Sequence, residues 1–165
     1  MPRPAADPVR EQLLALIDAA FDHVSWHGPN LRGAIRRVDA RQAAWRPAPR
    51  RHSIAEIVLH AAYWKYAAWR RLTGQPRGSF SLPGSNWFEQ PEPFSAGDWQ
   101  RWVKLLLEQH ARLRGAVAAF SRRRLSDVPA GARVTNAALI RGVAFHDVYH
   151  AGQIQLLKRA YAARR

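Results

Sequence analysis

The sequence contains no cysteine, and this absence excludes several kinds of chemistry. A chain without cysteine has no disulfide framework, no cysteine-ligated zinc site and no thiol nucleophile of its own. If the protein acts on sulfur compounds, a small-molecule thiol must therefore supply the sulfur.

Long apolar runs are also absent. None approaches the roughly 18 residues of a membrane-spanning helix, and the apolar segment at 13–17 is interrupted by Asp18 and lacks a signal-peptide pattern. We therefore expect a soluble, cytoplasmic protein without a membrane partner. The 165 residues are enough for a single domain, over residues 1–165, that needs no disulfide or structural metal to fold.

Lysine is scarce, because Lys65, Lys104 and Lys158 are the only lysines among 26 basic residues. The net charge of +14 therefore comes almost wholly from arginine. A strongly basic chain can bind nucleic acid or another polyanion. The arginines are nevertheless spread along the sequence, in short clusters such as those at 50–51 and 122–124. Nucleic-acid binding is therefore the minor alternative, since charge alone mostly gives non-specific affinity.

The first half of the chain predicts one long helix and two short ones. The long helix begins after Asp7, keeps apolar residues on one face as far as Val24, and ends at the glycine-proline pair at 28–29. Short connecting helices are expected over 30–38 and 39–44, each preceded by a residue suited to capping.

A second long helix opens at Ser53, which forms a capping-box pattern with Glu56, and stops near Gly74. The segment 75–97 that follows is rich in proline and glycine and predicts neither helix nor strand. A connection of this length is either a lid or binding loop, or a crossover that covers the core with its aromatic residues.

The second half of the chain predicts two more long helices. One starts at Ser95 or Asp98, and the other covers Val134–Lys158 after a polar, basic linker at 121–134. Four amphipathic helices, one long crossover loop and no strand signal together predict an all-α four-helix bundle.

The last helix carries two histidines, His146 and His150, in its apolar stripe. Two histidines four residues apart lie on one helical face, so both rings can reach a single ion. The alternative is a pair of buried, neutral, hydrogen-bonded histidines without a metal. His23 and His27 repeat the spacing, but they lie at the expected frayed end of the first helix.

A third ligand would decide between these alternatives. The order His146-Asp147-x-x-His150 resembles a shortened zinc-protease pattern, with Asp147 as the general base. No aspartate, glutamate or histidine follows His150, so the downstream ligand of such enzymes is absent. The third ligand must then come from an earlier helix, where His60 and His110 are comparable candidates on pattern alone.

Three segments make the chain resemble a known family. They read AWRP at 44–47, HSIAEIVLH at 52–60 and GVAFHDVYHAGQI at 142–154, and WHGP at 26–29 is similar to one branch. By these segments the chain resembles, over nearly its whole length, the DinB/YfiT-like family of bacterial four-helix bundles.

The resemblance implies a metal site and a class of reaction. The implied ligands of a divalent ion, nickel or zinc, are His60, His146 and His150, and His110 becomes a residue of the core or a support for a ligand. Three imidazoles leave open positions on an ion, as catalytic sites do. We expect a metal-dependent enzyme of stress or detoxification that acts on a small-molecule substrate. A transferase using a low-molecular-weight thiol is expected first, and a hydrolase second.

Other features remain open at this stage. Glu56 and Asp147 could orient ligand rings, although Asp147 lies roughly 100° off the apolar stripe, which favours a solvated carboxylate. Arginines near the site could bind the carboxylates of a thiol. Exposed aromatic residues suggest a homodimer. The alternative function is a non-catalytic, stress-related protein that binds nucleic acid or another polyanion through its basic surface.

Overall fold

The computed structural model describes residues 7–164, and in this range it contains helices and no strand. The all-α class expected from the sequence is confirmed. The helices are α1 (Pro8–Phe21), α2 (Leu31–Ile35), α3 (Ala40–Ala44), α4 (Ile54–Thr73), α5 (Ala96–Ala118), the short 3₁₀ helix η1 (Arg122–Arg124) and α6 (Asn136–Ala163). Within the described range, no helix is both long enough and apolar enough to cross a membrane.

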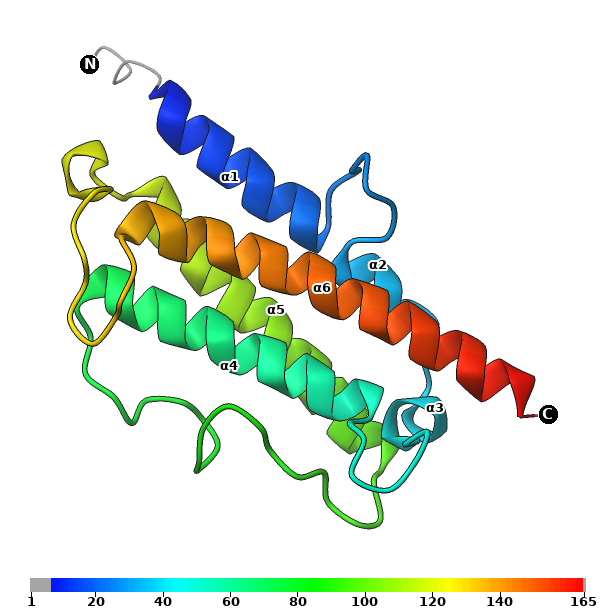
Figure 1. The fold of residues 1–165 in the computed structure, drawn as a ribbon. Coiled ribbons are helices and arrows are strands. Elements are labelled where there is room, and N and C mark those ends of the chain that lie inside the picture. Colours follow the sequence, from blue (N-terminus) through cyan, green and yellow to red (C-terminus); the bar gives the residue numbers. More distant parts are fainter. Residues whose placement is uncertain (1–6, 165) are drawn as a thin grey trace.

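The four long helices lie side by side (Figure 1). Helix α6 lies between α1 and α4, while α5 packs against α4 and also contacts α1. The two short helices fill the end of the molecule where α6 approaches its C-terminus, and α2 packs directly on α6. This arrangement places the middle of α4 against the middle of α6, which is where the candidate site forms.

The helix starts follow from local capping chemistry. Ser53 caps α4, and its hydroxyl accepts a hydrogen bond from the backbone N–H of Glu56, whose side chain accepts one in return from the N–H of Ser53. Ser95 and Asp98 form the same reciprocal pair at the start of α5, and Thr135 caps α6. Such caps satisfy N–H groups that have no partner within the helix. The predicted starts of these three helices are therefore confirmed.

The predicted end of the first helix is wrong. Helix α1 ends at Phe21, and Val24, which was expected on its apolar face, is fully exposed. The chain turns away because the side-chain amide of Asn30 donates a hydrogen bond of 2.7 Å to the carbonyl of His23. Asn30 also caps α2, so one residue both closes the loop after α1 and starts the next helix. Helix α2 in turn ends at Ile35, before the predicted end at residue 38.

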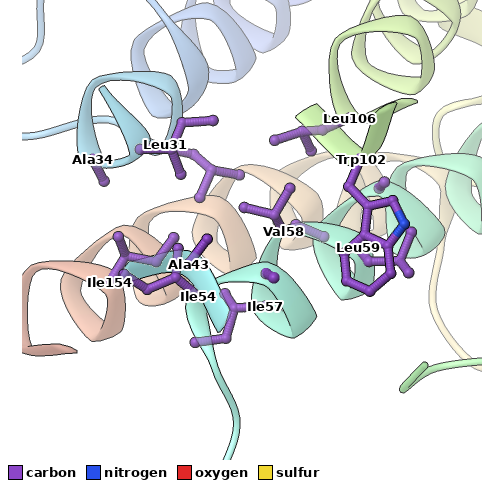
Figure 2. Packing of buried hydrophobic residues seen from close by; sticks show 14 of the residues in the cluster. Leu31, Ala34, Ala43, Ile54, Ile57, Val58, Leu59, Trp102, Leu106 and Ile154 are labelled. Carbon is purple, nitrogen blue, oxygen red and sulfur yellow. The ribbon is translucent and has the colours of Figure 1, made fainter. Parts of the chain in front are cut away.

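The core is built around α4, whose residues 54–62 are all buried. Figure 2 shows the apolar side chains that meet there. They include Ile54, Ile57, Val58 and Leu59 of α4, Leu31 and Ala34 of α2, Ala43 of α3, Trp102 and Leu106 of α5, and Ile154 of α6. Close packing of this kind fixes the rotation of α4 and α6, and thereby the directions of the polar residues that share their buried faces.

The segment between α4 and α5 has no helix or strand over residues 74–95, as predicted. Its aromatic residues do cover the core, since Phe88 is buried and packs with Phe80 against Tyr63 of α4. Neighbouring residues of the same segment, Asn86 and Trp87, contact the histidines instead. The segment therefore covers the core, as one alternative predicted, while its function as a lid or binding loop stays a prediction.

Candidate metal centre

Three histidines from two helices converge on one point. His60 projects from α4, and His146 and His150 project from adjacent turns of α6. The Nε2 atom of His146 lies 3.0 Å from Nε2 of His60 and 3.0 Å from Nε2 of His150. His60 and His150 are buried and His146 is half-buried. The structure therefore brings together the three residues named by the family resemblance.

The hydrogen bonds of two of the rings fix which nitrogen carries the proton. His60 Nδ1 lies 2.8 Å from the backbone carbonyl oxygen of Asn86, and His150 Nδ1 lies 2.7 Å from Oε1 of Gln153. The amide of Gln153 is oriented by its own donation to the Tyr149 hydroxyl, at 3.0 Å. Because these oxygens can only accept, both Nδ1 atoms donate, and both Nε2 atoms turn a lone pair toward the centre.

The histidines are held in the neutral form. Burial lowers the pKa of His60, and burial together with the neighbouring histidines lowers the pKa of His146 to about 3. Burial also lowers the pKa of His150 to about 4, against the opposing effect of the Gln153 hydrogen bond. All three rings are therefore neutral at neutral pH, which is the form that binds metal ions.

The spacing of the nitrogens fits a shared cation. Lone pairs on adjacent nitrogens repel one another unless a proton or a cation lies between them. Two nitrogens each about 2.1 Å from one ion stand about 3.0 to 3.4 Å apart for right-angled to tetrahedral ligation. The two separations of 3.0 Å from His146 fall in this range, and the ligand nitrogens of all three histidines lie within 4.8 Å of one another. Within residues 7–164, these histidines form the one cluster of at least three side chains able to hold a metal ion.

Aromatic rings brace the histidines. The indole of Trp87 stacks on the ring of His60, with centroids 3.9 Å apart. It also stacks on the ring of His52, with centroids 3.5 Å apart. Trp64 meets His60 and His146 edge-on at 6.4 Å and 6.3 Å. These contacts limit rotation of the rings, so the directions of the nitrogens are set before any ligand arrives.

A cavity of about 470 Å³ opens directly on the three histidines. Apolar and aromatic side chains line much of it, among them Ile57, Trp87, Tyr149 and Leu157. Arg51 is its one arginine, and no carboxylate lines it. The sequence did not say which arginines lie near the site, and Arg51 lines this cavity; its binding of a thiol carboxylate stays a prediction. The volume and lining of the cavity suit a small molecule with an apolar part and a negative charge.

Glu56 does not orient a ligand ring. It lies in the same helix as His60, yet its carboxylate accepts two hydrogen bonds from the guanidinium of Arg46, at 2.7 and 3.2 Å, and one from the N–H of Ser53 at 2.8 Å. The arginine and the cap lower the pKa of Glu56 against the effect of burial. Glu56 is therefore not solvated and contacts none of the three converging histidines, although His52 Nδ1 lies 3.8 Å from its carboxylate, and it secures the start of α4.

The interpretation of Asp147 as a solvated carboxylate is wrong. Asp147 is only 1% exposed and forms an ion pair with Lys65 of α4. The buried stripe of α6 passes through Ile140, Val143 and Ile154. Position 147 lies four residues after Val143 and therefore on this stripe, so the offset of roughly 100° that the sequence suggested for Asp147 is wrong. A facing lysine allows the carboxylate to be buried there.

Three of the other histidines, His110, His27 and His23, lie outside this centre, whereas His52 lines its cavity. The ring of His110 stacks on Phe21 with centroids 3.6 Å apart, which makes it a core residue. His27 is exposed in the loop that follows α1, and His23 contacts Asp22 in the same loop. Neither spacing nor burial alone separates His60 from His110, because both are buried on inward helical faces.

Two supporting residues were not found from the sequence. Asn86 and Trp87 belong to the loop before α5, and their contact with His60 depends on the path of that loop. The one local signal was the proline- and glycine-rich composition of the segment around Asn86. In the structure Asn86 adopts a left-handed conformation with φ of 67°. Asparagine tolerates this conformation better than most residues.

Comparison with family models gives a match to the DinB superfamily over residues 23–154. The matched range includes all three converging histidines as well as Asn86, Trp87 and Gln153. Comparison with curated proteins and with solved structures gives no match.

Proposed function

The chain belongs to the DinB superfamily, and from this membership we propose that it binds a divalent metal ion, nickel or zinc, through His60, His146 and His150. The observation that carries the proposal is the convergence of three neutral imidazoles, two of which turn a lone pair inward because their Nδ1–H groups are engaged. Hydrogen bonds of this kind to the outer nitrogen are usual for metal-binding histidines.

Three protein ligands suit a catalytic centre. Structural sites use four, whereas catalytic sites leave at least one position for water or substrate. A bound ion would supply Lewis acidity, which makes a thiol or a water molecule easier to deprotonate. The cavity beside the histidines offers room for a substrate at this point.

We infer that the reaction is transfer of a low-molecular-weight thiol to an electrophile. The thiol proton leaves to solvent, a bond forms between sulfur and the electrophilic carbon, and the leaving group departs with its bonding electrons. Arg51 would bind a carboxylate of the thiol, and Trp87 and Tyr149 would hold the apolar electrophile. The absence of cysteine fits an external source of sulfur. A hydrolase with a deprotonated water is the second candidate, and stress or detoxification is the proposed physiological setting.

Metal content tests the ligand set. We expect the purified protein to contain nearly one equivalent of nickel or zinc by elemental analysis, and His60→Ala to lose most of it. His110→Ala is the matched control, because it removes a buried histidine from the neighbouring helix but leaves the three ligands. Retention of metal in His60→Ala together with its loss in His110→Ala would refute the ligand assignment. Circular dichroism of each variant separates loss of metal from loss of fold.

Activity is tested separately from binding. Low-molecular-weight thiols are screened against an electrophilic aryl halide, with the wild-type protein, the chelator-treated protein and His60→Ala compared under the same conditions. The proposal predicts turnover by the metal-loaded wild type only. Equal turnover by all three preparations would show that the reaction does not use this centre.

A further inference from the structure

A second cavity, of about 590 Å³, lies between α4 and the loop at 77–86. Two residues that contact the metal centre, Trp64 and Asn86, also line this cavity, but none of the three histidines does. Cavities of roughly 300–1,000 Å³ are typical of small-molecule sites. Nothing in the proposed metal chemistry uses this space.

The charge in this cavity is of one sign. Arg70, Arg71 and Arg77 line it, and no carboxylate does. None of the three arginines forms an ion pair with any residue in the described part of the chain. Arg70 donates instead to the backbone carbonyl of Gln75, at 3.3 Å. Three guanidinium groups therefore face one cavity without a protein anion to balance them.

Arg71 is the most constrained of the three. Its Nε atom is buried and has no hydrogen-bond partner within residues 7–164. Burial, followed by the positive charges of Arg70 and Arg77, lowers the pKa of Arg71. A buried donor without a partner is costly, and so is a cluster of like charges. An anion placed among these guanidinium groups would relieve both costs.

Aromatic rings line the same cavity. Tyr63 and Phe80 meet edge-to-face with centroids 5.4 Å apart, and the guanidinium of Arg71 lies 6.0 Å from the centroid of Trp64. Such rings offer faces and edges on which a flat, unsaturated ligand can pack. The cavity therefore combines sites for an anion with sites for an aromatic group.

We propose that this cavity binds a small organic phosphate that carries an aromatic ring, the chemistry of a nucleotide. Guanidinium groups match phosphate oxygens in pairs, and three of them in one cavity match several negative charges better than a single carboxylate would. The aromatic residues would pack against the base. A small molecule is favoured over a polynucleotide because these arginines gather in a walled cavity, whereas the other arginines are spread along the chain.

Binding of ATP to chelator-treated protein, measured by calorimetry at about physiological salt, tests the proposal. Removing metal first prevents phosphate from being held at the histidine centre. We expect the double variant Arg71→Gln/Arg77→Gln to bind ATP at least tenfold more weakly than wild type. Arg133→Gln/Arg159→Gln is the charge-matched control, because both arginines are exposed and lie outside the cavity. It should change affinity less than twofold.

Other ligands distinguish the parts of the proposed molecule. Adenosine and inorganic pyrophosphate should each bind more weakly than ATP, since each lacks one half of the recognised chemistry. Equal affinity for pyrophosphate and ATP would overturn the aromatic requirement, and a single-stranded oligonucleotide that binds more tightly than ATP would overturn the choice of a small ligand. Failure of wild type to bind ATP would overturn the proposal entirely.

Two further variants guard against misleading results. Arg77→Gln alone changes only an exposed loop residue, so it tests the cavity even if the double variant is unstable. His150→Ala should bind ATP as wild type does, because His150 lies outside the cavity and its ring contacts none of the aromatic residues that line it. Loss of ATP binding in His150→Ala would place the nucleotide at the histidine centre and refute the second site. The proposed metal function can therefore fail or hold independently of this one.

Discussion

Lys65 of α4 and Asp147 of α6 form an ion pair in the core, where their side chains are 0% and 1% exposed. Burial lowers the pKa of Lys65 and raises that of Asp147, while the charge of each partner opposes the shift. The ammonium group also lies 4.7 Å from the ring centroid of Phe21. Because Asp147 directly follows His146, this pair ties α6 to α4 beside the candidate metal centre.

The first prediction concerns this pair. Lys65→Met leaves the Asp147 carboxylate buried without a counter-charge, and we expect the free energy of unfolding to fall by about 3–5 kcal/mol. The double variant Lys65→Met/Asp147→Leu removes both charges, and it should recover most of that loss because a well-packed apolar pair avoids the desolvation cost. Urea unfolding followed by circular dichroism measures all three proteins.

An exposed ion pair provides the control for that measurement. Lys104 and Glu108 pair on the surface of α5 at 3.7 Å, so Lys104→Met should cost no more than about 0.5 kcal/mol. If Lys65→Met and Lys104→Met had equal effects, the buried pair would not have the stabilising role assigned to it.

The parts of the fold that the sequence predicts correctly depend on local chemistry. Two helix starts are indicated by capping boxes, Ser53 with Glu56 and Ser95 with Asp98, because both members of each box lie within one turn. The end of α1 was missed because it depends on Asn30, which reaches back seven residues to the carbonyl of His23. Composition near Val24 gives no sign of that bond.

The residues of the site differ in the kind of sequence information that predicts them. Spacing alone pointed to His146 and His150, since a helix places them on one face. The choice of His60 needed the family resemblance, because the alignment of α4 with α6 is a tertiary property. Asn86 lies on a loop without periodicity and was not predictable. The expected homodimer stays a prediction. Tyr149 is one exposed aromatic residue that could contact a second copy, and sedimentation measurements of the oligomeric state test this.

The second prediction concerns Gln153, which holds the His150 ring through Nδ1. Gln153→Met keeps the size of the side chain but removes the acceptor, so the ring can rotate or change its tautomer. We expect metal affinity to fall about 10- to 100-fold with little change in thermal stability of the metal-free protein. Titration with nickel or zinc in competition with a chelating indicator measures the affinity.

Gln155→Met is the control for this substitution. Residue 155 lies two positions further along α6, and its side chain makes no hydrogen bond in the described structure. Its metal affinity should match that of wild type. A similar loss in both variants would mean that Gln153 acts through general packing of α6 rather than through the histidine ring.

The third prediction concerns the pH dependence of metal binding. Protons compete with the ion for the histidines only as pH falls toward the pKa of each ring in the folded protein. That pKa is about 3 for His146 and about 4 for His150. We therefore expect the metal to be retained from about pH 8 down to about pH 5, and to be released below about pH 4. Dialysis at each pH followed by elemental analysis tests this. Release centred near pH 6.5, the ordinary histidine value, would contradict it.

The fourth prediction concerns acid stability and the pair formed by Asp18 and Arg114. Two hydrogen bonds of 2.6 and 2.8 Å join the guanidinium of Arg114 to the carboxylate of Asp18. These hydrogen bonds and the charge of Arg114 lower the pKa of Asp18 below its ordinary value of 3.8. A carboxyl with a lowered pKa stabilises the folded state above its unfolded pKa. This contribution is lost as pH falls through the folded value.

Asp18→Asn should therefore reduce the free energy of unfolding at pH 7 by about 1–2 kcal/mol, a modest value because Arg114 is half-exposed. The difference from wild type should shrink as pH falls below about 4, since protonated Asp18 then resembles asparagine. Urea unfolding at pH 7 and at about pH 3 measures it, with Asp127→Asn as the control because Asp127 is exposed and its side chain makes no hydrogen bond in the described structure. A difference that stays constant across this range would show that Asp18 contributes through its shape rather than its charge.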